Sequence, residues 1–470
     1  MQILTDSWKR CIKNVIIALI LLLVFYALAG EQMKKTAVEV SVPEAAGYIS
    51  PAYDGMVVEQ SVFLKTDYIE SVDVITKNSG TAGEGRIEFY IAGPDNEVIF
   101  STDIPAQDCV DYAPYRVVMQ EPLHVNKDSE YIFRFIFRGD IQKLPSLAFG
   151  PRAKTAHVQL AVEGEEKEGI LCIGCRGYQT EVFGQFFNVF CAAVLLAVAA
   201  WTVLNERARA RGKVTLPDTL RKYRFLIEQL VSRDFKVKYK RSVLGYFWSF
   251  LNPLLTMLVQ YIVFSTLFRS GIKNYPVYLL SGNIIFSFFS EAVSTGLMAI
   301  VGNAPLISKV YVPKYIYPMT KVFSSAINLV ISVGPLLIVA VMTGTGITPA
   351  VLLIPFALVC LLIFCLGMVF LLSAINVFFR DTQYLWGIIS LIWMYATPIF
   401  YPAEIIPERL RFIQTWNPLF HVISFVRSVL IDGISPRPQT YLFCAASALI
   451  SLLIGTFVFK KAEGRFALYI

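Results

Sequence analysis

The chain has 470 residues, of which 55% are hydrophobic and 16% are charged. Typical soluble domains contain about 25% charged residues, so this composition excludes a soluble protein and indicates an integral membrane protein. The formal net charge of +7 does not indicate nucleic-acid binding, because the basic residues cluster beside apolar runs, as the positive-inside rule requires.

The first apolar run covers residues 15–29 and follows several basic residues. Basic residues stay on the cytoplasmic side of a membrane-crossing segment, so residues 1–14 are predicted to be cytoplasmic and the next segment to be exported. Ala27-Leu-Ala29 also fits a signal-peptidase site. We expect an uncleaved transmembrane anchor, with a cleaved signal sequence as the alternative.

Residues 30–185 have the pattern of an all-β extracytoplasmic domain. Short alternating stretches are separated by clusters of Gly, Pro, Asn and Asp, which is typical of an antiparallel sandwich of jelly-roll or immunoglobulin-like type. The strand starting at Glu59-Gln60 and the strand Tyr131-Ile-Phe-Arg-Phe135 resemble the β-sandwiches attached to cell-surface glycan machinery. Their aromatic side chains fit a carbohydrate-binding surface or, as we favour, the core. The predicted strands are 56–64, 69–76, 86–91, 115–119 and 131–137.

The chain contains 8 cysteines, most of them in or beside apolar runs, where a role as small hydrophobic filler is expected. Cys172-Ile-Gly-Cys175 has the spacing of half a zinc site, but no second pair of ligands accompanies it. In an exported segment a disulfide between Cys172 and Cys175 is the favoured prediction, with zinc as the weaker alternative. We assign no metal site.

A second apolar run at residues 186–204 predicts a transmembrane helix, and the arginines after it place its end in the cytoplasm. Residues 205–246 then form a basic cytoplasmic linker that ends in an amphipathic segment. Its cationic groups can stay among lipid headgroups while its apolar face enters the membrane. This predicts an interfacial helix that contacts membrane lipids. Its candidate residues are Arg233, Asp234, Lys238, Tyr239 and Arg241.

Residues 247–470 predict a six-span helical core, because a helix of about 20 apolar residues crosses roughly 30 Å of hydrocarbon. The basic residues in the connections favour both termini inside. The predicted fold class is a polytopic α-helical membrane protein with two extra N-terminal spans and an all-β exported sandwich. The predicted core spans are 247–267, 277–300, 322–343, 350–375, 384–400 and 440–459.

The segment from about Leu220 to Ile470 carries a series of short motifs in a fixed order. They are Arg233-Asp234, Ser242-Val-Leu-Gly245, Asn303-Ala-Pro-Leu-Ile-Ser-Lys309, Val312-Pro-Lys314, Asn376-Val-Phe-Phe-Arg-Asp381, Thr397-Pro-Ile-Phe-Tyr-Pro402, Asn417-Pro-Leu419 with Arg427, and Phe459-Lys-Lys-Ala-Glu463. Their combination resembles the permease subunits of ABC-2 type transporters, in particular exporters of lipid-linked O-antigen polysaccharides and teichoic acids. The outer domain and its two flanking spans lie outside this family pattern.

The resemblance implies a place in the bacterial cytoplasmic membrane, two separate ATPase subunits and a lipid-linked cell-surface polysaccharide as substrate. We also expect a homodimer, because six spans of one copy are not expected to enclose a path as wide as a polymer and closed two-fold assemblies are the commonest solution. The sequence has no Gly-x-x-x-x-Gly-Lys-Ser/Thr phosphate loop, so we expect no cofactor in this chain, with ATP and Mg bound by the partner subunit. A proline-bounded segment after the second core span is the candidate docking element, with a solvated loop as the alternative. The candidate coupling residues are Asn303, Pro305, Leu306, Ile307, Lys309, Val312 and Pro313.

An outer gate is predicted at residues 401–432, which are long for a loop and contain several prolines. Non-helical backbone at membrane depth must be covered by protein or must line a water-filled cavity. Two short re-entrant helices, which the resembled family has at this place, meet this condition; a helix on the outer membrane surface is the alternative. The candidate gate residues are Pro398, Tyr401, Pro402, Asn417, Pro418 and Arg427.

Glu291 is an acidic residue well inside a predicted span. A charge there costs at least about 2.5 to 3.5 kcal/mol, so Glu291 should face a cavity, find a partner or be protonated. Aromatic rings can stack on sugars and pass them along without tight binding. The candidate pathway residues are Tyr246, Trp248 and Glu291, with helix packing as the alternative role.

Two other classes of protein fit the sequence less well. A membrane glycosyltransferase or polymerase needs paired carboxylates or a metal-binding cluster; no such pair is evident, and the 3 histidines are dispersed. A surface receptor would not need six spans after its second anchor. We therefore predict a transport permease rather than an enzyme and assign no catalytic residue.

Overall fold

The chain forms two compact units, a β unit of Lys34–Phe183 and a helical unit of Met1–Met33 with Gly184–Ile470. Each is described by itself below, from a computed structural model. The residues that the structure describes are 2–34, 36–40, 45–49, 52–77, 85–109, 114–127, 129–139, 144–151, 159–180, 182–211, 216–238, 244–245, 247–265, 274–309, 312–345, 347–403, 406, 409 and 411–469.

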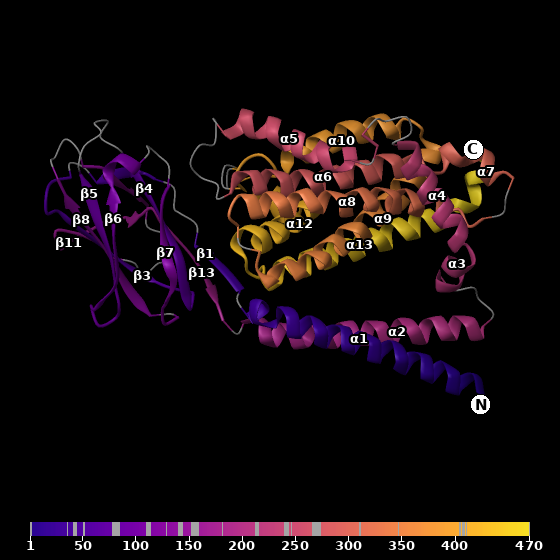
Figure 1. The fold of residues 1–470 in the computed structure, drawn as a ribbon, viewed down its shortest axis with the longest axis horizontal. Helices are drawn as coiled ribbons and strands as arrows, with labels where there is room; N and C mark the ends of the chain where they lie inside the picture. The colour runs from indigo at the N-terminus through magenta and orange to yellow at the C-terminus, as the bar shows by residue number, and fades with distance from the viewer. Residues whose placement is uncertain are drawn as a thin grey trace. The chain divides into compact units, whose positions relative to one another are not determined.

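The β unit is an antiparallel sandwich, as predicted (Figure 1). One sheet has the strand order β1-β13-β4-β9-β12, with β2 added beside β9 and β7 added beside β4. The other has the order β11-β10-β3-β8-β5-β6. The strands are β1 (Thr36–Val40), β2 (Gly47–Ile49), β3 (Val57–Phe63), β4 (Tyr68–Lys77), β5 (Arg86–Ala92), β6 (Val98–Pro105), β7 (Pro114–His124), β8 (Glu130–Arg138), β9 (Ser146–Gly150), β10 (Leu160–Val162), β11 (Glu165–Lys167), β12 (Ile170–Leu171) and β13 (Ile173–Gln179).

The core of the β unit explains its aromatic strands. In β8 the alternate residues Phe133, Phe135 and Phe137 are fully buried, as expected for a strand with one face on the core. Phe89 of β5 stacks on Phe135 with a ring-centroid distance of 4.8 Å. The opposing sheet contributes residues such as Val72 to the same cluster. These rings therefore fill the core, which was the favoured interpretation.

Strands β1 and β13 fix where the chain enters and leaves the β unit. They pair antiparallel, with Thr36 opposite Gln179. Since β1 is the first strand and β13 the last, both connections to the helical unit start from the same end of neighbouring strands. This arrangement suits a sandwich that is inserted between two consecutive helices of the helical unit.

The predicted disulfide between Cys172 and Cys175 is wrong, because both residues are free cysteines in the structure. Cys172 lies between β12 and β13, and Cys175 lies within β13. In extended backbone, residues three apart are separated by about 10 Å and point to opposite faces, whereas a disulfide needs Cα atoms within about 7 Å. Both side chains are instead buried in the β unit.

We expect these two thiols to be unreactive in the folded protein. Burial raises the pKa of Cys172 to about 11 and that of Cys175 to about 12. Because the thiolate is the reactive form, both residues should resist a maleimide at pH 7.5 and should react once urea unfolds the β unit. Mass spectrometry of the modified peptides checks this. A Cys172–Cys175 cross-linked peptide under non-reducing conditions would contradict the structure.

The helical unit contains long helices joined by short elements (Figure 1). Its N-terminal helices are α1 (Gln2–Lys34) and α2 (Val182–Ala210). The remaining elements are α3 (Leu216–Lys222), α4 (Arg224–Lys238), α5 (Phe247–Ser265), α6 (Tyr275–Leu297), η3 (Val301–Asn303), α7 (Ala304–Ile307), α8 (Ile316–Met342), η4 (Pro349–Leu353), α9 (Ile354–Phe378), α10 (Thr382–Ala396), α11 (Arg411–Thr415), α12 (Pro418–Arg427), the π-helical turn η7 (Ser428–Asp432), α13 (Pro438–Ala462), η8 (Glu463–Arg465) and α14 (Phe466–Tyr469).

Among the described residues, 6 helices are long and apolar enough to cross a membrane: α2 and, in the core, α5, α6, α8, α9 and α13. The predicted span 384–400 is shorter than expected, because α10 has 15 residues and ends at Ala396. A helix of that length extends only about 22 Å. Pro398 explains the early end, since a proline disfavours helical backbone at the residue before it, and Thr397 is extended with φ −99° and ψ 128°.

Helices α9 and α13 approach each other closely at two glycines. A Cβ atom added to Gly455 would lie 2.0 Å from the carbonyl oxygen of Gly367. A Cβ added to Gly367 would lie 2.2 Å from the backbone of Ser451. Small residues at such crossings let membrane helices pack backbone to backbone, which replaces the hydrophobic effect that is absent in lipid.

Replacing Gly455 with Ala should therefore destabilise the helical unit by about 1 to 3 kcal/mol, the usual cost of overpacking. The thermal unfolding midpoint of the purified chain in detergent measures the effect. Gly387→Ala is the matched control, because nothing lies within 4 Å of the added methyl group in α10. Equal midpoints for the two variants would show that α9 and α13 do not meet at Gly455.

Candidate functional site

Three membrane helices carry polar residues at helical spacing. They are Ser249, Asn252 and Thr256 on α5, Asn283, Ser287 and Glu291 on α6, and Ser325, Asn328 and Ser332 on α8. Residues three or four apart lie on one face of a helix. Each of these mainly apolar helices therefore has a polar stripe, which costs free energy unless the stripe faces protein or water.

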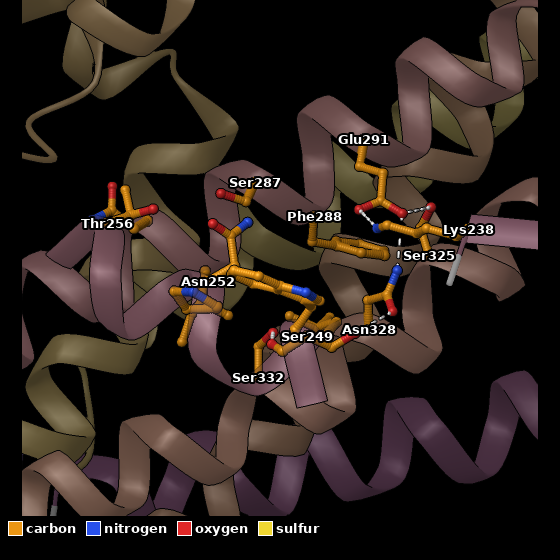
Figure 2. A pocket seen from close by; sticks show the side chains of 15 residues that line it. Lys238, Ser249, Asn252, Thr256, Ser287, Phe288, Glu291, Ser325, Asn328 and Ser332 are labelled. Atoms are coloured by element: carbon orange, nitrogen blue, oxygen red, sulfur yellow. Dashed lines mark hydrogen bonds and ion pairs between the residues drawn. The ribbon is translucent and has the colours of Figure 1, made fainter. Parts of the chain in front are cut away.

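The three stripes line one cavity of about 400 Å³. Lys238 at the end of α4 and the apolar residues Trp248 and Phe288 complete much of the wall. Figure 2 shows Glu291 and Lys238 together at one end of the cavity and Thr256 at the other. A polar cavity between membrane helices can hold water or a polar ligand.

Glu291 has both a cavity and partners. Its Oε2 lies 2.7 Å from Lys238 Nζ, and its Oε1 accepts hydrogen bonds from Ser325 Oγ at 3.2 Å and Asn328 Nδ2 at 3.0 Å. The side chains of Lys238 and Glu291 are 42% and 33% exposed. The pair is therefore neutral overall, hydrogen-bonded and open to the cavity, which removes most of the cost of a charge at this depth.

Further hydrogen bonds hold α5, α6 and α8 together around the cavity. Ser249 Oγ donates to Asn328 Oδ1 at 3.1 Å, and Ser332 Oγ donates to the Ser249 carbonyl at 3.2 Å. The Asn283 amide bonds the Gln260 side chain. The network fixes the positions of the cavity walls, since each bond joins two different helices.

The second cluster of interest surrounds the non-helical backbone that follows α10. Arg427 of α12 donates to the carbonyls of Pro398 at 2.8 Å, Ile399 at 3.2 Å and Tyr278 at 3.0 Å. Its guanidinium also lies 3.3 Å from the centre of the Tyr278 ring. The Tyr275 hydroxyl bonds the Phe400 carbonyl at 2.8 Å. The carbonyls of the non-helical segment after α10 are thus satisfied by protein, as membrane burial demands.

Asn417 ties the start of α12 to the end of α10. Its Oδ1 accepts from the Leu419 backbone N–H at 3.1 Å, which caps α12, and from Trp393 Nε1 at 2.9 Å. Its Nδ2 donates to Thr397 Oγ1 at 2.8 Å. Helix α12 packs against α6, α9 and α13, and most of its apolar residues are buried. A helix lying free on the membrane surface would not be covered in this way.

The predicted docking segment forms a short helical structure, η3 followed by α7. Leu306 and Ile307 pack against an apolar cluster that includes Leu230 of α4, Ile316 of α8 and Phe466 of α14. The other side of the segment is exposed at Pro305 and Lys309, Val312 is buried, and Pro313 is half-buried. The segment is therefore fixed on one side and accessible on the other.

Helix α4 is connected to this segment and to α8 through charged groups. Arg233 Nη2 donates to Asn303 Oδ1 at 3.5 Å, and Asn303 Nδ2 bonds the Ala299 carbonyl at 2.7 Å. Asp234 forms an ion pair of 2.8 Å with Lys321 at the start of α8. The sequence motif Arg233-Asp234 thus has a structural explanation: one residue contacts the docking segment and the other contacts a core helix.

The structure groups the candidate residues differently from the sequence. Lys238, predicted as an interfacial residue, lies at the cavity with Glu291 and Trp248. Pro402 is half-buried after Tyr401, and Pro418 is the first residue of α12. Tyr239, Arg241 and Tyr246 are outside the described residues.

Several functional candidates were missed from the sequence. They are the polar stripes themselves and the hydrogen-bonding residues Tyr275, Tyr278 and Trp393. The stripes have a signal that could have revealed them, namely Ser, Asn and Thr at a spacing of three to four in apolar helices. Among the described residues, no group of His, Cys, Asp and Glu side chains could hold a metal ion.

Replacing Arg427 with Lys should lower the thermal unfolding midpoint clearly. Lysine keeps the charge but lacks the planar fork that reaches several carbonyls, and each buried acceptor left without a donor costs about 1 to 3 kcal/mol. Thermal unfolding of the detergent-purified chain measures this, with Arg409→Lys at an exposed position as the control. A midpoint unchanged by Arg427→Lys would show that the guanidinium does not hold the segment after α10.

The sequence matches the ABC-2 type transporter family over residues 226–431. The O-antigen export system permease protein RfbA of Myxococcus xanthus is 30% identical over 256 residues, which cover 54% of this chain and 98% of that protein. The polysialic acid transport protein KpsM of Escherichia coli is 24% identical over 246 residues, covering 50% and 93% of the two chains. The capsule polysaccharide export inner-membrane protein BexB of Haemophilus influenzae is 23% identical over 256 residues, covering 53% and 95%. This chain therefore belongs to the ABC-2 type transporter family, as its motifs predicted.

Proposed function

We propose that this chain is the membrane subunit of an ABC exporter that moves a lipid-linked cell-surface polysaccharide, such as O-antigen, teichoic acid or a related glycan, across the cytoplasmic membrane. The observation that carries the proposal is the polar cavity between α5, α6 and α8, in a chain whose aligned relatives are named as polysaccharide export and transport proteins. A hydrophilic polymer needs such a polar surface within the hydrocarbon. ATP and Mg are bound by separate ATPase subunits, and this chain holds no cofactor of its own.

The segment η3–α7 is the proposed contact for the ATPase. Its exposed side is available to a partner, while Leu306 and Ile307 transmit force into the cluster shared by α4, α8 and α14. From there the Arg233–Asn303 contact and the Asp234–Lys321 ion pair lead to α4 and α8. Lys238, one turn beyond Asp234 on α4, reaches the cavity at Glu291. A movement of α7 can thus change the cavity through a continuous set of contacts.

The cluster around Arg427 is the proposed outer gate. The extended backbone after α10 and the short helix α12 are joined by hydrogen bonds from Arg427, Tyr275 and Asn417. A few hydrogen bonds of this kind can be exchanged when the gate opens, whereas a continuous membrane helix would have to be broken. The β unit, which the chain inserts between α1 and α2, is proposed to be the extracytoplasmic part of the protein.

The proposed assembly is a homodimer with two ATPase subunits. Apolar side chains on α5 and α10 are exposed, including Val259, Ile262, Leu385 and Ile392. In a membrane these residues face lipid or a second copy of the chain. Closed two-fold assembly is the commonest arrangement of identical subunits, and it would place two cavities around one path.

The proposal is tested by Asp234→Asn, which removes the charge that pairs with Lys321 and keeps the side-chain shape. Export measured in inverted membrane vesicles should fall about tenfold or more, since a hydrogen bond to a charged group contributes about 1.5 to 3 kcal/mol. The ATPase should still co-purify, because the exposed side of α7 is unchanged. Glu228→Gln on the same helix, which loses an exposed ion pair with Arg224, is the control and should export normally.

Two results would contradict the proposal. One is purification of the full-length chain from native membranes without any ATPase. The other is glycan export by the wild-type chain that continues when ATP is absent.

A further inference from the structure

We propose that the cavity between α5, α6 and α8 is a binding site for a single uncharged sugar residue of the glycan, held between the Lys238–Glu291 pair and the polar stripes of the three helices. This inference rests on the proposed function and adds the place and the chemistry of one contact with the substrate. It concerns a cavity within one copy of the chain.

The cavity wall offers hydrogen-bonding groups of the kind that hydroxyl groups need. An amide side chain has both donors and an acceptor, and a hydroxyl can act as either. Within the described part of the chain, the side chains of Asn252, Thr256 and Ser287 make no hydrogen bond to another residue. Polar groups left without partners inside a membrane protein are costly, so these three side chains are suited to a bound ligand or to the water that it displaces.

The electrostatics of the cavity favour an uncharged ligand. Lys238 and Glu291 contribute opposite charges 2.7 Å apart, so they sum to zero. A phosphate group that approached Lys238 would meet the Glu291 carboxylate at once, and like charges in contact cost several kcal/mol. A sugar hydroxyl can instead accept from Lys238 and donate to Glu291 without disturbing the charge balance.

The apolar part of the wall suits a sugar ring. Phe288 lines the cavity between Asn252 and the ion pair (Figure 2), but it is only 4% exposed and offers a ligand little surface, whereas Trp248 is 41% exposed. Trp248 adds a second aromatic ring to the wall. Small-molecule sites commonly combine aromatic walls with a few placed polar groups, and a pyranose ring presents CH groups to such rings while its hydroxyls reach the polar stripes.

The volume of the cavity is large enough for one sugar residue. A cavity of about 400 Å³ lies at the small end of ligand sites, which span about 300 to 1,000 Å³. The proposed site therefore holds one sugar unit of the glycan and contributes selectivity for it.

Saturation-transfer NMR tests the site on the full-length chain in lipid nanodiscs. The probe is the mixture of neutral oligosaccharides released by mild acid from the envelope glycan of the producing cells. The wild-type chain should transfer saturation to the sugar protons, and Ser287→Leu, which puts a larger apolar side chain into the cavity wall, should lose this transfer. Ser294 lies two turns further along α6, at an exposed position outside the cavity wall. The control variant Ser294→Leu should therefore keep the saturation transfer.

Sodium pyrophosphate serves as the second probe. It should neither bind at the cavity nor displace the oligosaccharides. Competition by pyrophosphate, or no transfer to the oligosaccharides from the wild-type chain, overturns the proposed ligand class. Equal transfer in Ser287→Leu and the wild type overturns the location.

Two further measurements separate a wrong sugar site from a folding defect and from a wrong proposed function. The unfolding midpoint and ATPase co-purification of Ser287→Leu show whether that variant folds, and Asn252→Leu provides a second filled cavity. If the wild-type chain exports no glycan, the proposed function is wrong. If the wild type exports and both cavity-filling variants export at the wild-type rate, only the sugar site is wrong.

Discussion

Inside the hydrocarbon, every polar group must find its partner within the protein, because water is not there to bond it. This constraint organises the helical unit at two places. Near one end, the carbonyls exposed where α10 stops are taken up by Arg427, Tyr275 and Tyr278. Near the other, Glu291 is held by Lys238, Ser325 and Asn328. Both places are polar and closely hydrogen-bonded, and the backbone after α10 is also non-helical.

Helix α4 connects the surface of the helical unit with its interior. Arg233 and Asp234 reach the docking segment and α8, and Lys238 lies one turn further on, about 6 Å along the axis. The apolar face of the same helix is anchored through Leu230. In contrast, α9 and α13 are locked by contact between Gly367 and Gly455. The unit thus combines a tightly packed pair of helices with a set of charged contacts that join α4 to η3 and α8.

The main features of the architecture could be predicted from the sequence, because each depends on the hydrophobic pattern of many residues together. Apolar runs located the membrane helices, and alternation located the strands of the sandwich. Local geometry was harder to predict. Pro398 shortened α10 through a single restricted backbone position, and the Cys172–Cys175 spacing suggested a bond that extended backbone does not permit. The cavity was missed because it requires three polar stripes to face each other, and only the packing of α5, α6 and α8 shows that they do.

The central claim is that this chain forms the conduit of a transporter whose ATPase docks on the segment η3–α7. An electron cryomicroscopy reconstruction of the chain, purified from native membranes with no partner added, tests it most directly. The account predicts a two-fold assembly with density of a second protein against Pro305 and Lys309 of both copies. A single copy of the chain with this segment bare would contradict it.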